Sequence, residues 1–308
     1  MKKIVTTLSL IIAFNYASHS QNSNNMKQDS NYTYATVPTQ FVEANGIKFA
    51  YRSYGKTGDI PVIYFNHLTA NLDNCDPRIM DAIAQHRQII SFDYRGIGAT
   101  SGKQGENLLD MAKDGIAFIN ALGYKQVDIM SFSMGGMISQ EILLLEPTLI
   151  RKLILAGTGP RGGAGMPAVV GRTYSDIFRG LLTFRDPKVY LFFNQNKIGK
   201  AAAKDFLNRL KERKENRDKK VQLYALKKQL KAIKDWGNAN PMDLSLFKLP
   251  VLIVNGDNDR MVPSILSNDM GKRFPNAEPV VIYPNSGHGG IFQYHEEFLK
   301  KAIPFLTK

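Results

Sequence analysis

Short apolar runs recur along the chain, and most of them are separated by segments long enough to form a helix. Runs of this length, rich in branched and aromatic side chains, predict buried β-strands. The predicted strands are Val62–Phe65, Ile89–Phe92, Val127–Met130, Leu153–Ala156, Val251–Val254 and Val280–Tyr283. Strands that alternate with helices favour a mostly parallel, twisted sheet with helices on both faces, which is an α/β fold.

The sheet is expected to open with a hairpin. Asn45-Gly46 lies between two β-prone stretches within Phe41–Tyr51. Asn-Gly favours the tight turn that joins two antiparallel strands, because both of its residues tolerate a positive φ. We therefore predict that folding begins near Phe41 with an antiparallel hairpin.

The alternation of strands and helices is interrupted in the second half of the chain. No β-like run occurs over residues 158–242, whereas apolar residues within Leu223–Ile233 repeat at helical spacing. This predicts an inserted, mainly helical lobe over residues 158–242. The α/β core is then formed by residues 41–157 and 243–308.

The N-terminus has the pattern of a secretory signal. Two lysines precede the apolar run Ile4–Phe14, which is shorter than the roughly 20 residues that cross a bilayer. We predict a signal peptide over residues 1–20, cleavage before Gln21 and export to the periplasm or the medium; the alternative is an N-terminal helix that is retained. The polar residues that follow favour a disordered leader over residues 21–40.

Composition and charge exclude several classes of protein. The chain has 308 residues, of which 44% are hydrophobic and 22% charged, as in globular proteins. One cysteine, Cys75, cannot form a thiolate zinc site. Of the net charge of +13, most lies in Arg185–Lys234, which has 16 Lys and Arg against 5 Asp and Glu. A solvated helix face is favoured over an anion-attracting surface; nucleic-acid binding is disfavoured because no recognition motif accompanies the charge.

The segment that follows the predicted strand at Val127 has the pattern of a nucleophile elbow. It reads Ser131-Phe-Ser133-Met-Gly135-Gly136 and continues into an amphipathic helix. Such a turn holds its central serine in a strained backbone conformation, so the residues two before and two after it must be small. Glycine is usual at the first of these positions, and Ser131 departs from that pattern in this chain.

A base and an acid for this serine occur in the expected order. Serine becomes a nucleophile when a histidine removes its proton and a carboxylate orients that histidine. Asp257 and Asp259 follow the predicted strand at Val251, and His288 follows the next strand between glycines. The order Ser133, aspartate, His288 is that of the α/β-hydrolases.

From Phe41 to Phe305 the sequence resembles the α/β-hydrolase superfamily, in particular its esterase and cofactor-free haloperoxidase-like branch with an F-S-M-G-G elbow. The resemblance also rests on Phe92–Ser101, similar to the D-x-R-G-x-G-x-S segment, and on Gly256–Pro263, similar to G-x-x-D-x-x-V-P. It implies that Asp259 is the acid, with Asp257 as the alternative.

The resemblance implies an oxyanion hole that differs from the usual one. The family usually has His-Gly after the strand that ends at Phe65, whereas this chain has Asn66-His67-Leu68. By position, the backbone N–H groups of Leu68 and Met134 would hold the oxyanion. His67 is either a polar contact to the substrate or oxyanion loop, or a hydrogen-bonded loop anchor.

Together these features imply a serine hydrolase that cleaves a carboxylic ester through an acyl-enzyme on Ser133. The reaction requires no metal and no organic cofactor, the partner is a small-molecule ester, and no membrane span or nucleic-acid partner is expected; no oligomeric state is predicted. Alternatives are a C–C bond hydrolase, a lactone hydrolase or a perhydrolase with the same triad. A catalytically silent protein that binds through the basic lobe is an alternative of another class.

The helical lobe is expected to cover the C-terminal ends of the strands, where ligands bind in open α/β sheets. Most of its large apolar residues should form the core of the lobe, and some should line an acyl or alcohol pocket. These residues include Phe178, Leu181, Leu182, Tyr190, Phe192 and Phe193.

Overall fold

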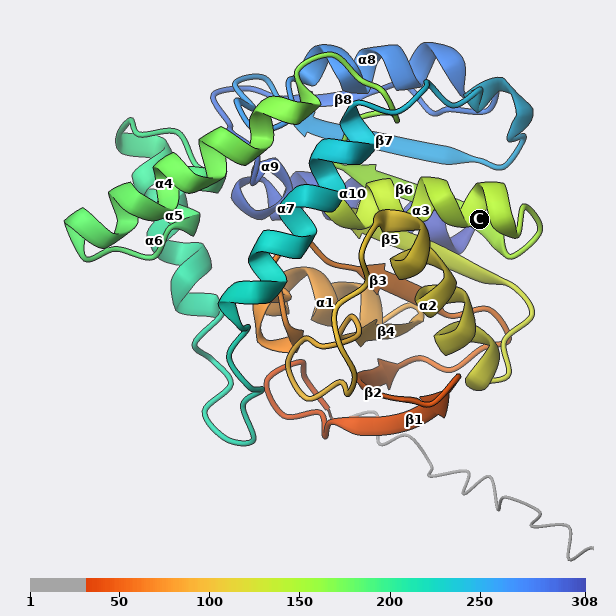
Figure 1. Cartoon of the computed structure of the whole chain (residues 1–308). Coiled ribbons are helices and arrows are strands. Elements are labelled where there is room, and N and C mark those ends of the chain that lie inside the picture. The colour runs from red at the N-terminus through yellow and green to blue at the C-terminus, as the bar shows by residue number, and fades with distance from the viewer. Residues whose placement is uncertain (1–31) are drawn as a thin grey trace, which may run out of the picture.

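The computed structural model describes residues 32–308, so the predicted signal peptide and the first part of the leader lie outside the described residues. Its strands are β1 (Gln40–Ala44), β2 (Ile47–Gly55), β3 (Val62–Phe65), β4 (Gln88–Phe92), β5 (Val127–Phe132), β6 (Ile150–Ala156), β7 (Val251–Gly256) and β8 (Val281–Tyr283). They form one sheet with the order β1-β2-β4-β3-β5-β6-β7-β8 (Figure 1). The predicted strands and the α/β fold class are confirmed.

The sheet is parallel from β4 through β3 to β8 and antiparallel at the edge formed by β1 and β2. Asn45 and Gly46 join β1 to β2 with φ values of 50° and 74°. Both residues therefore adopt the left-handed conformation that a two-residue hairpin turn requires. The predicted hairpin is confirmed.

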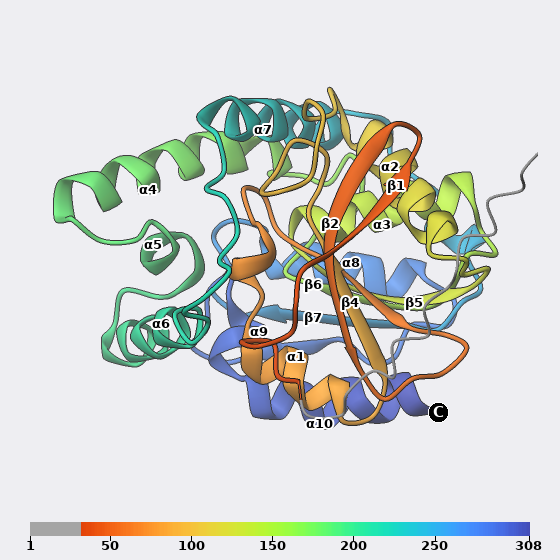
Figure 2. The same cartoon turned by 90° about the horizontal axis from the view of Figure 1, so that it is seen from below.

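Helices cover both faces of the sheet (Figure 2). On one face lie α2 (Leu108–Ala121), α3 (Met134–Leu145) and α8 (Ser264–Arg273), and on the other lie α1 (Pro77–Ala84), α9 (Gly290–Gln293) and α10 (His295–Thr307). Successive strand residues alternate between these two cores, as Ile63 and Tyr64 do. Within residues 32–308 no helix is long and apolar enough to cross a membrane.

The segment between β6 and β7 is helical, and none of the strands lies in it. It contains α4 (Val169–Thr183), α5 (Lys188–Phe192), α6 (Lys197–Arg209) and α7 (Leu223–Gly237). In Figure 1, α4, α5 and α6 lie to the left of the sheet, and α7 runs diagonally between them and the strands. Short 3-10 helices occur in the chain at Leu72–Asn74, Met166–Ala168 and Leu244–Leu246. We refer to the segment from β6 to β7 as the cap.

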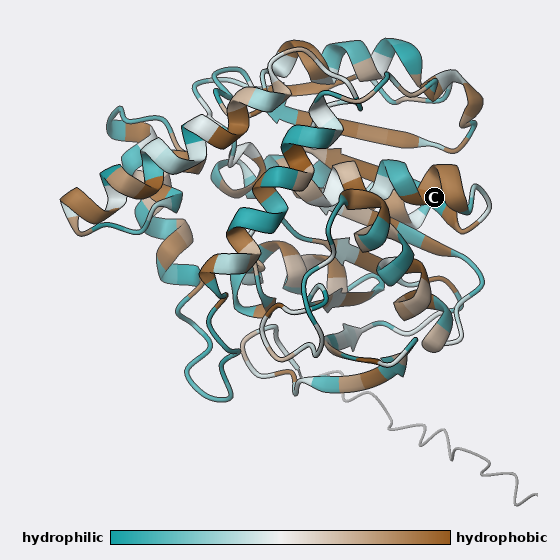
Figure 3. Cartoon of the chain, in the orientation of Figure 1, coloured by the Kyte–Doolittle hydropathy of each residue, from teal (hydrophilic) through white to brown (hydrophobic). Residues whose placement is uncertain are grey.

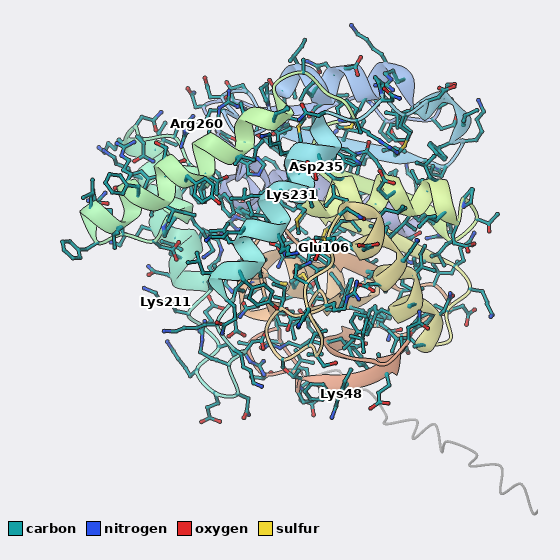
Figure 4. The ribbon with its side chains drawn as sticks, in the orientation of Figure 1. Lys48, Glu106, Lys211, Lys231, Asp235 and Arg260 are labelled. Atoms are coloured by element: carbon teal, nitrogen blue, oxygen red, sulfur yellow. The ribbon has the colours of Figure 1, made fainter. Side chains whose placement is uncertain are left out.

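The basic helix α7 turns its apolar stripe inward and its lysines outward. The buried residues of the stripe are Leu226, Leu230 and Ile233. Lys231 pairs with Asp235 at 2.5 Å on the exposed face (Figure 4), and Lys228 pairs with Glu106. Exposed pairs of this kind contribute little to stability, so this part of the charge forms a solvated face.

Polar contacts in buried positions attach the cap to the core. Nε and Nη2 of Arg209, at the end of α6, donate to the carboxylate of Asp76 at 2.7–3.1 Å. The indole N–H of Trp236 donates to Glu141 at 2.7 Å. A charge in a buried position is costly without its partner. The cap is therefore fixed to the core at α1 and at α3.

Residues 32–39 differ from the predicted disordered leader over residues 21–40, because they pack on the core. Tyr34 is 2% exposed, and its hydroxyl donates to the carbonyl of Leu72 at 2.7 Å. The guanidinium of Arg213 donates to carbonyls of this segment, including that of Val37 at 2.9 Å. These contacts order a segment whose polar composition alone gives no such signal.

The end of α4 exposes large apolar residues (Figure 3). Phe178, Leu181 and Leu182 are 60%, 70% and 63% exposed. The expectation that these three form the core of the lobe or line its pocket is therefore wrong, because they lie on the outer face of the helix, whereas the buried face of α4 includes Val169 and Thr173.

Two carboxylates meet where the cap crosses the segment after β4. Asp93 is 1% exposed, and Asp218 lies between α6 and α7. A Cβ atom on Gly98 would be 2.3 Å from Oδ2 of Asp93 and 2.2 Å from Oδ2 of Asp218. Burial first, and then Asp218 through a hydrogen bond and its charge, raises the pKa of Asp93 well above its usual value. Because Gly98 has no Cβ, the two carboxyl groups have room to lie side by side.

A carboxyl whose pKa is raised on folding stabilises the protein at low pH, and this stabilisation is lost as the pH rises through the folded-state pKa. Asp218→Asn removes the repulsion, so we expect it to raise the midpoint of thermal unfolding more at pH 8 than at pH 5, by about 2–4 °C for each kcal/mol regained. Circular dichroism measures both midpoints.

Asp235→Asn, at an exposed carboxylate, is the control and should shift the midpoint equally at the two pH values. An equal shift for Asp218→Asn would contradict the coupling of Asp218 to the buried carboxyl of Asp93.

Candidate active site

Ser133 occupies a strained turn between β5 and α3. Its φ is 56° and its ψ is −119°, a combination that is costly for a residue with a side chain. Its N–H donates to the carbonyl of Ala156 on β6 at 2.9 Å. A Cβ on Gly135 would lie 2.1 Å from the carbonyl oxygen of Phe65. Only glycine fits there. The close approach of β3 to the helix start therefore requires the small residue two positions after the serine.

Ser131 replaces the usual glycine without disturbing this turn. Its Oγ donates to the carbonyl of Ile154 on β6 at 2.7 Å, in a fully buried position. The hydroxyl is therefore satisfied by the neighbouring strand.

Three of the predicted residues form one continuous chain of hydrogen bonds. Nε2 of His288 lies 2.9 Å from Oγ of Ser133, and Nδ1 of His288 lies 2.8 Å from Oδ2 of Asp259. The other carboxylate oxygen of Asp259 accepts the N–H groups of Met261 and Val262 at 2.8 and 2.9 Å. Since a carboxylate only accepts, Nδ1 carries the proton and Nε2 is left to accept from the serine hydroxyl.

Asp257 points away from this chain. Its two carboxylate oxygens accept the backbone N–H groups of Asn285 and Ser286 at 2.9 and 3.0 Å. Within the described hydrogen bonds it makes none to His288. Asp257 therefore shapes the loop that carries the histidine, and Asp259 is the carboxylate in contact with the imidazole.

The loop after β3 leaves one amide free beside the serine. The N–H of His67 donates to Oδ1 of Asn66 at 2.8 Å, and that of Ala70 donates to the carbonyl of His67 at 3.2 Å. The N–H of Thr69 is held by Gln229 at 2.6 Å. Leu68 N–H has no acceptor among the described residues, and Leu68 lines the same cavity as Ser133.

Met134, the other residue expected to hold an oxyanion, is the first residue of α3. The first amides of a helix have no partner within the helix, and the helix dipole makes this end positive. Its position directly after Ser133 places a free donor at the nucleophile.

Gln229 is a residue beside the site that the sequence did not predict. It lies on α7, is fully buried, and joins the cap to the loop after β3 through Thr69. The available signal was a polar residue at a core-facing position, between Leu226 and Leu230, in an otherwise apolar stripe.

His67 is buried against the site. Its ring packs edge-on against Phe132 and Phe192, with centroids 5.7 and 5.0 Å away, and its Nδ1 lies 2.7 Å from the carbonyl of Leu68. Burial, with the positive charge of Lys188 as the next cause, lowers its pKa to about 3. The imidazole is therefore neutral at ordinary pH.

A cavity of about 370 Å³ opens over Ser133 and His288, between the core and the cap. Its wall is mainly apolar and includes Val169, Leu191 and Leu226 from the cap. Of the lobe residues considered from the sequence, Phe192 lines this cavity, whereas Tyr190 and Phe193 are buried in the cap without lining it. The cavity is suited to a small organic ligand.

The matching family model, described as alpha/beta hydrolase fold, covers residues 60–293. The chain belongs to the α/β-hydrolase fold family. It is similar to the solved structure of an alpha/beta hydrolase fold protein from Chitinophaga pinensis, with 36% identity and a TM-score of 0.83 over 89% of this chain and 99% of that one.

Two curated relatives that match most of this α/β-hydrolase are hydrolases by name. A Haemophilus influenzae protein provisionally named an esterase/lipase is 27% identical over 85% of this chain and 88% of its own length. The 2-hydroxy-6-oxo-6-(2'-aminophenyl)hexa-2,4-dienoic acid hydrolase of Metapseudomonas resinovorans is 22% identical over 92% of this chain and 96% of its own. These relatives support a hydrolase of the α/β fold.

The two aspartates after β7 should respond differently to substitution. Asp259→Asn removes the charge that orients His288, and we expect kcat for an ester to fall by about a hundredfold or more. Asp257→Asn should change kcat by less than about tenfold, because the carboxylate of Asp257 binds Asn258 and backbone N–H groups of the loop rather than the imidazole. Steady-state kinetics of the two matched variants, with circular dichroism to verify folding, measure this difference. The reverse ranking would show that Asp257 is the acid.

Proposed function

We propose that the chain is a serine hydrolase that cleaves carboxylic esters through an acyl-enzyme on Ser133. The observation that carries this proposal is the unbroken hydrogen-bond chain from Ser133 through His288 to Asp259, located at the floor of an apolar cavity. A nucleophile, a base and an orienting carboxylate in mutual contact are the groups that acyl transfer requires.

In the first half of the proposed reaction, Oγ of Ser133 attacks the ester carbonyl carbon while Nε2 of His288 takes the hydroxyl proton. The carbonyl oxygen becomes an oxyanion, to which the N–H groups of Leu68 and Met134 donate. As the tetrahedral intermediate collapses, the bond to the alcohol oxygen breaks and the imidazolium gives its proton to that oxygen. Asp259 stabilises the imidazolium and holds its orientation.

In the second half, water attacks the acyl-enzyme and gives a proton to Nε2 of His288. Collapse of the second tetrahedral intermediate returns that proton to Oγ of Ser133 and releases the carboxylic acid. The cap excludes bulk solvent from these steps, which strengthens the hydrogen bonds to the oxyanion. Every proton is transferred by groups of this chain or by the substrate, so the mechanism uses no metal or cofactor.

The same three residues can serve C–C bond or lactone hydrolysis, and a relative of this chain is named as a dienoic acid hydrolase. We favour simple esters because the cavity wall is mainly apolar. A substrate panel with an aromatic dienoate and a lactone beside the esters separates these reactions.

The proposed ester hydrolysis is tested with p-nitrophenyl acetate, butyrate and octanoate. We expect turnover by the wild type, and a loss of at least about a thousandfold in Ser133→Ala, because the nucleophile is gone. Ser175→Ala, at an exposed serine of α4, is the matched control and should retain full activity. A fluorophosphonate should label the wild type and the control but not Ser133→Ala.

Equal activity of Ser133→Ala and the wild type would overturn the proposal. A wild type that neither turns over esters nor reacts with the fluorophosphonate would point to binding through the basic cap.

We also propose that the protein is exported, on the basis of the lysines and the apolar run Ile4–Phe14 at the N-terminus. The expected result is a chain in the periplasm or the medium whose N-terminal residue is Gln21, measured by mass spectrometry of the protein from each cell fraction. An uncleaved chain confined to the cytoplasm would contradict it.

A further inference from the structure

One nitrogen of His67, a residue that lines the cavity, has no hydrogen-bond partner among the described residues. The side chain is 3% exposed, and Nε2 has no hydrogen-bond partner among residues 32–308. The residue lines the cavity together with Ser133 and His288. A buried polar atom without a partner is costly, and a ligand in the cavity that His67 lines can bring the missing partner.

The protonation of this nitrogen follows from its neighbours. Nδ1 lies 2.7 Å from the carbonyl oxygen of Leu68, and because a carbonyl only accepts, Nδ1 carries the hydrogen. Burial first, and then the charge of Lys188, lowers the pKa of His67 to about 3, so the ring is neutral. Nε2 therefore presents a lone pair, and its partner must be a hydrogen-bond donor.

The groups around the ring do not supply that donor. Phe132 and Phe192 pack edge-on against it and have no polar atoms. The ammonium of Lys188 lies 3.3 Å from a carboxylate oxygen of Asp186. Nε2 of His288, the other nearby imidazole nitrogen, is engaged with the serine hydroxyl.

The ring lies close to the place where a bound carbonyl would react. His67 directly precedes Leu68, whose free amide is the proposed donor to the oxyanion. The two rings that His67 contacts, Phe132 and Phe192, also lie 4.9 and 5.7 Å from the ring of His288. A substrate with its carbonyl oxygen at Leu68 N–H thus has its neighbouring atoms beside His67.

We propose that His67 determines specificity by accepting a hydrogen bond from a hydroxyl or N–H group located within a few atoms of the reacting carbonyl. Short hydroxyacyl esters and esters of polyols both carry such a donor. An apolar ester of the same size desolvates Nε2 without replacing its hydrogen bond and is therefore disfavoured. This inference rests on the ester hydrolysis proposed above and adds a class of substrate to it.

Two pairs of substrates locate the donor. p-Nitrophenyl 3-hydroxybutyrate and p-nitrophenyl butyrate differ by one hydroxyl on the acyl part, and glycerol monobutyrate and propyl butyrate differ in hydroxyls on the alcohol part. We expect the wild-type full chain to favour the hydroxylated member of at least one pair by about tenfold in kcat/KM.

His67→Phe should reduce that ratio to about one. This variant also loses the bond to the carbonyl of Leu68, but a shifted oxyanion loop slows both members of a pair alike, so the ratio reports the contact at Nε2. His67→Gln keeps an acceptor and should retain part of the preference. His86→Phe, at an exposed histidine remote from the cavity, should keep the wild-type ratio.

A wild type that hydrolyses both members of each pair equally well would overturn the role of His67 and leave the esterase proposal intact. A preference that persists in His67→Phe would also overturn it. If the wild type hydrolyses none of these esters and none of the p-nitrophenyl panel, the proposed function fails first, and the inference about His67 fails with it.

Discussion

The conformation of Ser133 is the constraint on which the site depends. A left-handed backbone at a residue with a side chain is not stable in a free chain, so the surrounding structure must hold it. Two neighbouring strands stabilise this conformation. The carbonyl of Ala156 on β6 accepts the serine N–H, and the carbonyl of Phe65 on β3 lies so close that residue 135 has to be glycine. Reactivity at this serine therefore requires three adjacent parallel strands in register.

The cap takes part in the same architecture. Gln229 on α7 holds the N–H of Thr69 in the loop after β3. Arg260, next to Asp259 of the proposed triad, pairs with Asp176 on α4, beside which it lies in Figure 4. The cap thus positions both loops that border the serine in addition to forming the wall of the cavity. A change of substrate preference through the cap is consequently coupled to the geometry of the catalytic loops.

Much of this could be predicted from the sequence because the signals are local. Strands appear as apolar runs, the hairpin as Asn45-Gly46, and the serine, acid and base as short motifs that each follow a strand. The role of Gln229 could not be predicted, because its partner Thr69 is distant in the chain. Tyr34 and Val37 gave no periodic signal within a polar stretch, although both are buried in the folded protein.

The contacts of Arg213 limit how many N-terminal residues can be removed without loss of the fold. Its guanidinium, 6% exposed, donates to the carbonyls of Tyr34, Ala35 and Val37. A protease that cut the chain after Val37 would remove three of the carbonyls that accept from this buried cation and leave it that of Asn216, at a point where the cap meets the core. Removal of the first twenty residues spares this junction. The shortest mature form that keeps the cap in place must therefore begin before Tyr34.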